Sequence, residues 1–121
     1  MAAPTVFVDA ENVRRSTWPN VTRAELVELG CAWAAEERVR AVIVFDGPAP
    51  GVGVGEQVLT EHCAVVGTDG ESADSWIARA TRSAGRFWLV TSDRGLRAQA
   101  GEGAERVIGG GRFLKELRNT V

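Results

Sequence analysis

The stretch Val6-Phe7-Val8-Asp9-Ala10-Glu11-Asn12-Val13 joins an apolar run to a polar end that holds two acids and an amide. A short apolar run without alternation is typical of a strand that is covered on both faces, as in a parallel sheet. Ligands of such sheets bind outside the carboxyl ends of the strands. We therefore predict a buried strand that ends in a functional site at Asp9.

Two later stretches repeat this pattern. Ala41-Val42-Ile43-Val44-Phe45 is followed by Asp46, and Phe87-Trp88-Leu89-Val90-Thr91-Ser92 is followed by Asp93. Because the carboxyl ends of parallel strands lie at the same edge of a sheet, the three aspartates predict one shared acidic site.

Strands and helices are expected to alternate along the chain, which is typical of a doubly wound parallel sheet. After the first strand, we predict strands over residues 40–45, 63–66, 86–91 and 105–108, and helices over residues 22–37, 56–61, 71–84, 94–100 and 112–118. Thr22 and Glu25 have capping-box spacing at the start of the first long helix. Residues 12–20, a segment that could include a helical turn, and the Gly/Pro-rich residues 46–55 are predicted loops. The expected fold class is α/β, with three α/β/α layers around a central, mostly parallel five-stranded sheet.

Length and composition exclude several protein classes. The 121 residues fit a single domain over residues 1–121, and 45% of them are hydrophobic and 25% charged, as in soluble globular proteins. No apolar run approaches the ~18 residues of a membrane span, and Met1-Ala2-Ala3-Pro4 lacks the basic region of a signal peptide. We therefore expect a cytoplasmic protein that does not bind membranes. Cys31 and Cys63 lack metal-type spacing and are predicted to be buried thiols.

The net charge of −2 conceals an asymmetry between two parts of the chain. Residues 1–75 contain 5 arginines and 12 acids, whereas residues 76–121 contain 9 basic residues and 4 acids. An acidic site beside a basic surface suits metal ions and a phosphate backbone, although charged runs are also common on ordinary solvated surfaces.

Five acids are expected at the carboxyl edge of the sheet, with Glu11 and Asn12 nearby: Asp9, Asp46, Glu71, Asp74 and Asp93. Carboxylates about 4 Å apart repel by several kcal/mol at an effective dielectric near 20, so such a group takes up protons or binds a cation. Oxygen ligands without cysteine or histidine favour Mg²⁺ or Mn²⁺ over zinc. His62 is the only histidine, and we expect it to be structural or exposed.

Metal-assisted hydrolysis of a phosphate ester is the chemistry that this set of residues favours, because there is no histidine pair and no activated thiol. Arg14, Arg15 and Arg94 lie near the predicted site in sequence and could reach neighbouring phosphates. Trp18 could stack on a base, an interaction worth ~1–3 kcal/mol. Each of these residues also fits an ordinary surface or packing role.

Four segments, in order, resemble the motifs of the YacP-like branch of NYN-domain ribonucleases, whose fold is PIN-like. These segments are Val8-Asp9-Ala10-Glu11-Asn12-Val13, Val44-Phe45-Asp46-Gly47, Glu71-Ser72-Ala73-Asp74 with Ile77, and Val90-Thr91-Ser92-Asp93-Arg94. The resemblance covers nearly the whole chain. The first motif departs from the family pattern because Ala10-Glu11 replaces the usual Gly-Tyr, and Ser75 stands where members often carry another aspartate.

The resemblance implies divalent-metal-dependent endonucleolytic cleavage of RNA, presented alone or within a ribonucleoprotein. Asp9, Asp46, Asp74 and Asp93 would be the metal-site carboxylates. Asn12 would orient ligands or a phosphate, Glu71 would support the metal shell, and Ser92 could hydrogen-bond a site carboxylate or water.

Other functions remain open at the level of sequence. A non-catalytic RNA-binding or protein-interaction module could keep this fold, and a DNA-directed nuclease could use the same acids. A phosphoacceptor receiver domain also gathers acids at this edge, but it needs a lysine near the end of its last strand, and the only lysine, Lys115, lies in the predicted C-terminal helix. The number of metal ions, the RNA preference and the oligomeric state stay open.

Overall fold

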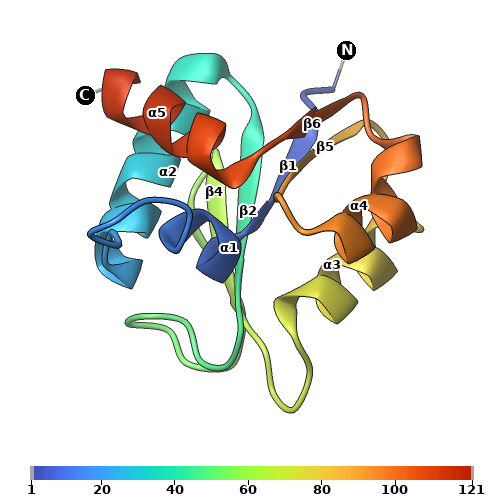
Figure 1. Cartoon of the computed structure of the whole chain (residues 1–121), viewed down its shortest axis with the longest axis horizontal. Helices are drawn as coiled ribbons and strands as arrows, with labels where there is room; N and C mark the ends of the chain where they lie inside the picture. The colour runs from blue at the N-terminus through green and yellow to red at the C-terminus, as the bar shows by residue number, and fades with distance from the viewer. Residues whose placement is uncertain (1, 121) are drawn as a thin grey trace.

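A six-stranded sheet in the order β3-β4-β2-β1-β5-β6 forms the centre of the computed structural model, which describes residues 2–120 (Figure 1). The strands are β1 (Thr5–Asp9), β2 (Arg40–Phe45), β3 (Gly55–Thr60), β4 (Cys63–Gly67), β5 (Phe87–Val90) and β6 (Arg106–Ile108). All neighbouring pairs within this range are parallel except β3 and β4. In the central strand β1, Val8 is paired with Ile43 on one side and Val90 on the other.

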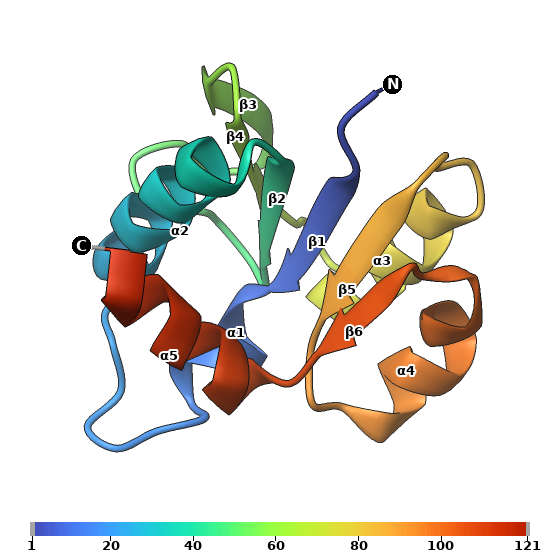
Figure 2. The same cartoon turned by 90° about the horizontal axis from the view of Figure 1, so that it is seen from above.

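Helices cover both faces of the sheet, so the predicted α/β class with three layers is confirmed. The helices are α1 (Ala10–Arg14), α2 (Arg23–Glu37), α3 (Ala73–Thr81), α4 (Arg94–Ala100) and α5 (Gly110–Thr120), with a short 3-10 turn at Gly101–Gly103. Figure 2 shows α2 and α5 on one face and α3 and α4 on the other. The helix α1 lies at the carboxyl end of β1 and is packed against α5.

Side-chain caps fix where the helices begin. The capping box predicted at α2 is present, because the Thr22 hydroxyl accepts a hydrogen bond from the Glu25 N–H and Glu25 reaches back to the Thr22 N–H. Ser72 caps α3 through the Ser75 N–H, and Asp93 caps α4 through the Leu96 N–H. These caps place Asp74 and Asp93 in or beside the first turns of their helices.

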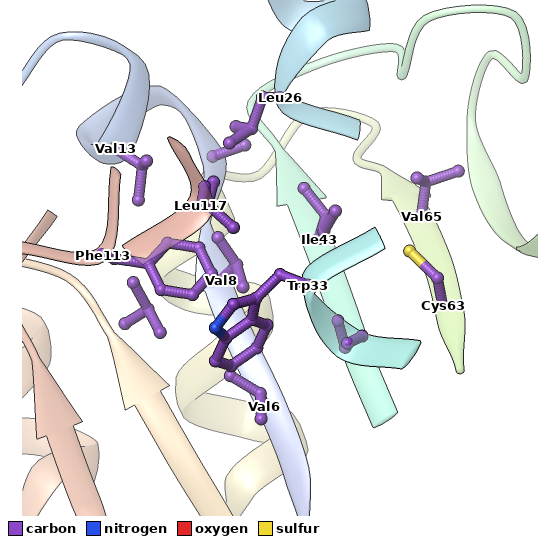
Figure 3. Close-up of a cluster of buried hydrophobic side chains, with 14 of the residues drawn as sticks. Val6, Val8, Val13, Leu26, Trp33, Ile43, Cys63, Val65, Phe113 and Leu117 are labelled. Atoms are coloured by element: carbon purple, nitrogen blue, oxygen red, sulfur yellow. The ribbon is translucent and has the colours of Figure 1, made fainter. Parts of the chain in front are cut away.

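Two hydrophobic cores lie on opposite faces of the sheet, because alternate residues of each strand point to opposite sides. Val6 and Val8 belong to the core beneath α2 and α5, and Phe7 belongs to the core beneath α3 and α4. In the first core the rings of Trp33 and Phe113 meet edge to face with centroids 4.9 Å apart (Figure 3). This contact joins α2 and α5 over one face of the sheet.

The helix predicted over residues 56–61 is wrong, because this segment forms the edge strand β3. Gly55 has φ of +106°, which does not lead into a helix, and the strand is hydrogen-bonded to β4 in an antiparallel hairpin. All six residues of β3 are exposed, so no apolar face marked the strand in the sequence. The sheet therefore has six strands instead of the predicted five.

Other boundaries shift by a few residues. The helix α1 covers residues 10–14, so the helical turn allowed in the predicted loop is present but begins before residue 12. The helix α3 ends at Thr81 rather than near residue 84, and α5 begins at Gly110 rather than at residue 112. The predicted helix over residues 94–100 is confirmed as α4. No helix within residues 2–120 is both long enough and apolar enough to cross a membrane.

The prediction that Cys31 and Cys63 are separate thiols is wrong, because the structure joins them in a disulfide with a Cα–Cα distance of 5.2 Å. Cys31 lies in α2 and Cys63 begins β4, so their proximity depends on how α2 packs on the sheet. His62 is half-buried, and its Nδ1 lies 3.1 Å from the Val39 carbonyl oxygen, which agrees with a structural role.

Candidate functional site

A pocket of about 540 Å³ lies at the carboxyl edge of the parallel strands. It is lined by Asp9, Glu11, Asn12, Arg15, Ser16, Asp46, Asp74, Ser92, Asp93 and Gly111. The structure therefore brings together four of the five predicted edge acids, and we call this the carboxylate pocket. Asp9 ends β1, Asp46 follows β2, Asp74 lies in the first turn of α3, and Asp93 precedes α4.

Asp9 is the most deeply placed of these acids, with 4% of its surface exposed. It stands at the N-cap of α1, but its side chain makes no capping hydrogen bond, so the carboxyl group faces the pocket instead. Burial raises the pKa of Asp9 to about 7, the Thr91 hydroxyl opposes this shift, and the negative charges of Asp74 and Asp46 increase it.

Thr91 is a site residue that the sequence analysis missed. Its fully buried hydroxyl donates a hydrogen bond to Asp9 Oδ2 at 2.9 Å and accepts one from the Asp93 N–H at 3.1 Å. The hydroxyl thus connects two of the acids. For Ser92, which was predicted to hydrogen-bond a site carboxylate or water, the hydroxyl accepts from the Gly110 N–H and keeps its own O–H free to donate at the pocket. The sequence offered one signal that Thr91 is the inward-facing residue: it directly follows the apolar run, whereas Ser92 lies one position further.

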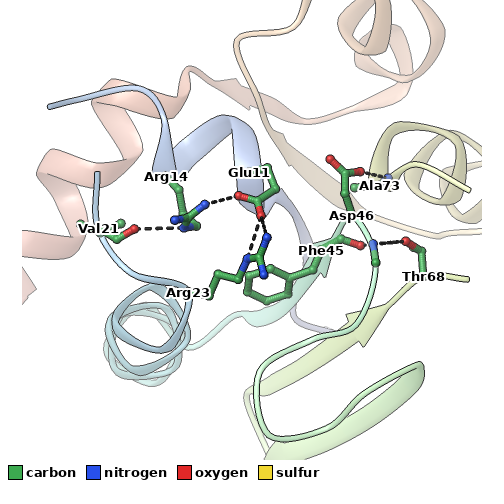
Figure 4. A network of polar contacts seen from close by, with 9 residues as sticks. Glu11, Arg14, Val21, Arg23, Phe45, Asp46, Thr68 and Ala73 are labelled. Carbon is green, nitrogen blue, oxygen red and sulfur yellow. Dashed lines mark hydrogen bonds and ion pairs between the residues drawn. The ribbon is translucent and has the colours of Figure 1, made fainter. Parts of the chain in front are cut away.

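Asp74 and Asp46 also line the pocket, close enough for their charges to act on Asp9. Burial raises the pKa of Asp74, a hydrogen bond with Asp9 opposes that shift, and the charges of Asp93 and Asp46 add to it. Asp46 Oδ1 accepts a hydrogen bond from the Ala73 N–H at 2.6 Å, at the start of α3 (Figure 4). This contact uses the positive end of α3 to hold Asp46 beside Asp74.

The loop after Asp46 is fixed by Thr68 at the end of β4. The Thr68 hydroxyl donates to the Phe45 carbonyl and accepts from the Gly47 N–H, as Figure 4 shows. Gly47 has φ of +79°, a conformation that glycine adopts without strain. The backbone therefore turns sharply after β2 and leaves Asp46 exposed at the pocket.

Asn12 is oriented by a hydrogen bond from Ser92, which is in turn hydrogen-bonded to the start of α5. Its Oδ1 accepts from the Ser92 N–H at 2.8 Å, and the Ser92 hydroxyl accepts from the Gly110 N–H at 2.9 Å. A Cβ on Gly110 would lie 2.9 Å from Asn12 Oδ1, so only glycine allows this approach of α5. With its oxygen engaged, the Asn12 side chain has its NH₂ group left to donate to a ligand.

Glu11 and Arg14 have structural partners that the sequence did not reveal. Glu11 is 4% exposed and forms ion pairs with Arg14 and with Arg23 of α2 (Figure 4). Burial acts to raise the pKa of Glu11, but the hydrogen bonds and charges of both arginines together lower it. Arg14 also donates from Nε to the Val21 carbonyl at 3.0 Å. We call Glu11, Arg14 and Arg23 the Glu11 clamp; its contacts occupy Arg14, which does not line the pocket.

Glu71 lies outside the carboxylate pocket. Both of its carboxylate oxygens accept hydrogen bonds from Arg79, at 2.7 and 2.8 Å, and this contact lowers the pKa of Glu71. The structure therefore gives no support for Glu71 in a metal shell. The third motif contributes Asp74, because only the first turn of α3 faces the pocket.

Of the other residues predicted to contact nucleic acid, some line the pocket and some do not. Arg15 lines it, together with Ser16 and Ser92. Arg94 is exposed in the first turn of α4, beside Asp93, but does not line the pocket. Trp18 is 88% exposed in the loop between α1 and α2 and is also outside it.

The pocket's donor set fits a hydrated divalent ion. Asp9, Asp46, Asp74 and Asp93 form no ion pair with any basic side chain of residues 2–120. In the same range, no three Asp, Glu, His or Cys residues lie close enough together to hold one ion. Magnesium commonly binds one or two protein carboxylates and keeps several waters, so four spaced carboxylates around a polar pocket suit it.

Comparisons with known proteins agree with this fold and motif order. The family model described as the YacP-like NYN domain matches residues 7–120. A crystal structure of a point mutant of Rae1 (YacP) from Bacillus subtilis is similar, with a TM-score of 0.70 and 21% identity over 97% of this chain and 76% of that one. A second crystal structure of Rae1 (YacP) from Bacillus subtilis gives a TM-score of 0.69 and 20% identity over 99% and 75% of the two chains.

At these identities the two crystal structures establish the fold. No curated protein sequence matches the chain. The family model spans all four motifs that carried the resemblance, from the first strand to the last helix, and confirms it. The chain belongs to the YacP-like NYN domain family.

Proposed function

We propose that this protein is a divalent-metal-dependent endoribonuclease that hydrolyses phosphodiester bonds in the carboxylate pocket. The observation that carries the proposal is the convergence of Asp9, Asp46, Asp74 and Asp93 on one pocket, with no basic side chain paired to them among the described residues. Membership of the YacP-like NYN family supports a nuclease-like, RNA-related role.

One or two of the four aspartates would hold Mg²⁺ or Mn²⁺ directly, and waters would fill its other coordination positions, because no three described acids lie close enough together to share one ion. When bound, such an ion lowers the pKa of a coordinated water and neutralises charge on the phosphate. The raised pKa of Asp9 supports this assignment, because a buried carboxylate surrounded by other carboxylates gains most from a nearby cation.

Other side chains of the pocket would bind and orient the RNA backbone. The NH₂ group of Asn12 is available for a phosphate oxygen, since the Ser92 N–H already occupies Asn12 Oδ1. The Arg15 side chain lines the pocket and would contact a phosphate next to the scissile one. Arg94 would serve the same purpose beyond Asp93, on the α4 side.

The proposal is tested with end-labelled single-stranded RNA and a matched DNA, incubated with the protein in Mg²⁺, Mn²⁺ or EDTA. Wild type should cut RNA only with metal, and Asp9→Asn should lose at least about 100-fold in rate, as expected when a metal carboxylate is removed. Asp69→Asn is a matched control, because Asp69 is exposed and does not line the pocket.

Two results would contradict the proposal. Retention of RNA without cutting under any metal condition would indicate a non-catalytic RNA-binding module. Equal cutting of RNA and DNA would show that the enzyme is not specific for RNA. Circular dichroism of Asp9→Asn would verify that the variant is folded.

A further inference from the structure

The loop between α1 and α2 presents an unusually exposed tryptophan. Trp18 is 88% exposed, the highest value among the exposed large hydrophobic side chains of the described residues. Trp33, by contrast, is 2% exposed, and Trp76 and Trp88 are packed against the two cores. Burying a large apolar side chain contributes about 1.5–3 kcal/mol, so a ligand that covered the Trp18 ring would gain binding free energy.

The loop that carries Trp18 is anchored at both ends. The Glu11 clamp ties α1 to Arg23 at the start of α2, and Arg14 Nε is hydrogen-bonded to the Val21 carbonyl. Within the loop, the Ser16 hydroxyl donates to the Val13 carbonyl at 2.6 Å. Val21 is buried in the core. The segment is therefore held in place while its tryptophan faces water, which favours a preorganised contact surface.

Trp18 stands close to the carboxylate pocket along the chain. Arg15 and Ser16 line the pocket, and Trp18 is three residues beyond Arg15, which limits the separation of their Cα atoms to about 11 Å. A strand that leaves the pocket past Arg15 would therefore pass within reach of the ring.

The charges near this loop suit a nucleic acid backbone. Arg15 is exposed at the pocket, and Arg112 is exposed directly after Gly111, another residue that lines the pocket. Neither arginine forms an ion pair within residues 2–120. An exposed aromatic ring beside unpaired arginines is typical of single-strand binding, because bases of a duplex are stacked on each other and cannot lie on a side chain.

We propose that Trp18 is a stacking platform for an unpaired base of the RNA strand that extends from the carboxylate pocket past Arg15. This inference rests on the proposed function in placing RNA at the carboxylate pocket. The Glu11 clamp then holds the platform in position before the RNA arrives.

The test measures binding in EDTA, so that it does not depend on cleavage. The whole chain, as wild type, Trp18→Ala or Trp18→Phe, is titrated into three fluorescently labelled probes: a short single-stranded RNA, the same RNA annealed to its complement, and an abasic strand of equal length. Val58→Ala is the control, since Val58 is 59% exposed but lies on the edge strand β3.

Trp18→Ala should weaken binding of the single strand about 5- to 100-fold, the range expected from loss of one base–aromatic stack. Trp18→Phe should retain most of the affinity, and Val58→Ala should leave it unchanged. Wild type and Trp18→Ala should bind the abasic strand equally, since it offers no base to stack. RNA should also quench tryptophan fluorescence in wild type, with most of the quenching lost in Trp18→Phe.

The inference is overturned if wild type does not bind the single strand, or if Trp18→Ala binds it as wild type does. It is also overturned if Trp18→Ala loses as much affinity for the abasic strand or the duplex. Failure of the proposed function can be told apart from failure of this inference. Trp18-dependent binding without metal-dependent cleavage would contradict the nuclease proposal and leave the stacking role of Trp18 standing. Metal-dependent cleavage together with equal binding by wild type and Trp18→Ala would contradict only the stacking role of Trp18.

Discussion

Asp9 and Glu11 are two positions apart, and each is 4% exposed, yet their surroundings are opposite. Asp9 faces three other carboxylates and has no basic partner in the described chain, and its pKa is raised to about 7, chiefly by burial. Glu11 lies between Arg14 and Arg23, which lower its pKa despite burial. Burial of an acid therefore does not by itself indicate its role. The charges around it separate a binding site from a structural ion pair.

The largest loss of stability is expected from removing the acid of the Glu11 clamp. Glu11→Ala should lower the free energy of unfolding by about 3 kcal/mol, because it leaves Arg14 largely buried without its carboxylate and releases the loop that begins at Arg15. Urea denaturation measures this change. Glu28→Ala, on the exposed surface of α2, is the control. A loss below about 1 kcal/mol would show that the clamp is not a structural element.

Removing the charge of Asp9 in the carboxylate pocket should instead raise the free energy of unfolding of the metal-free protein. The folded-state pKa of Asp9, about 7, lies above its ordinary value of 3.8, so the folded chain retains a proton that the unfolded chain loses between these pH values. Stability of the metal-free protein therefore falls as pH rises from about 4 to 7, and Asn at position 9 removes this loss.

In EDTA at pH 8, Asp9→Asn should therefore be more stable than wild type by at most about 4 kcal/mol, and the difference should shrink toward zero by pH 4. Thermal unfolding across this pH range would measure it. A variant less stable than wild type at pH 8 would show that Asp9 contributes to the fold as Glu11 does.

The stabilising effect of divalent ions should depend on the carboxylate pocket and not on the Glu11 clamp. Mn²⁺ at roughly 10 to 30 times its Kd should raise the free energy of unfolding of wild type by about 1–2 kcal/mol. The effect should disappear in Asp9→Asn. It should persist in Arg23→Lys, which changes the clamp but leaves all four aspartates in place. Equal stabilisation of Asp9→Asn and wild type would place the ion elsewhere.

The smallest effect is expected at Glu71, the acid that the structure places outside the pocket. Its hydrogen bonds with Arg79 lie at the surface, so Glu71→Gln should leave the unfolding midpoint unchanged within error and cleavage within about twofold of wild type. Asp74→Asn, three residues further along, should reduce cleavage much more. A comparable loss in both variants would return Glu71 to the site.

Sequence alone predicted the acids that end or follow apolar strands, because parallel strands bring their carboxyl ends to one edge. Asp9, Asp46 and Asp93 follow from this rule, and Asp74 follows from the start of α3. The residues that hydrogen-bond or pair with the acids could not be predicted by this rule. Whether Thr91 or Ser92 turns inward depends on the exact end of β5, and the pairing of Glu11 with Arg23 depends on the approach of two helices.

Two further differences between the predictions from sequence and the structure also arise from long-range packing. The edge strand β3 lacks an apolar face, so local propensity favoured a helix, whereas hydrogen bonding to β4 determines the observed structure. The disulfide between Cys31 and Cys63 depends on the placement of α2 over β4, and a separation of 32 positions carries no signal of it.

The order of the pocket residues along the chain has a consequence for synthesis. The four aspartates extend from residue 9 to residue 93, and the hydrogen bonds that orient Asn12 reach Gly110 in the last helix. A growing polypeptide therefore cannot complete the pocket until the start of α5 has left the ribosome. The activity proposed here would arise in one late step, so unfinished chains would be harmless to RNA around them.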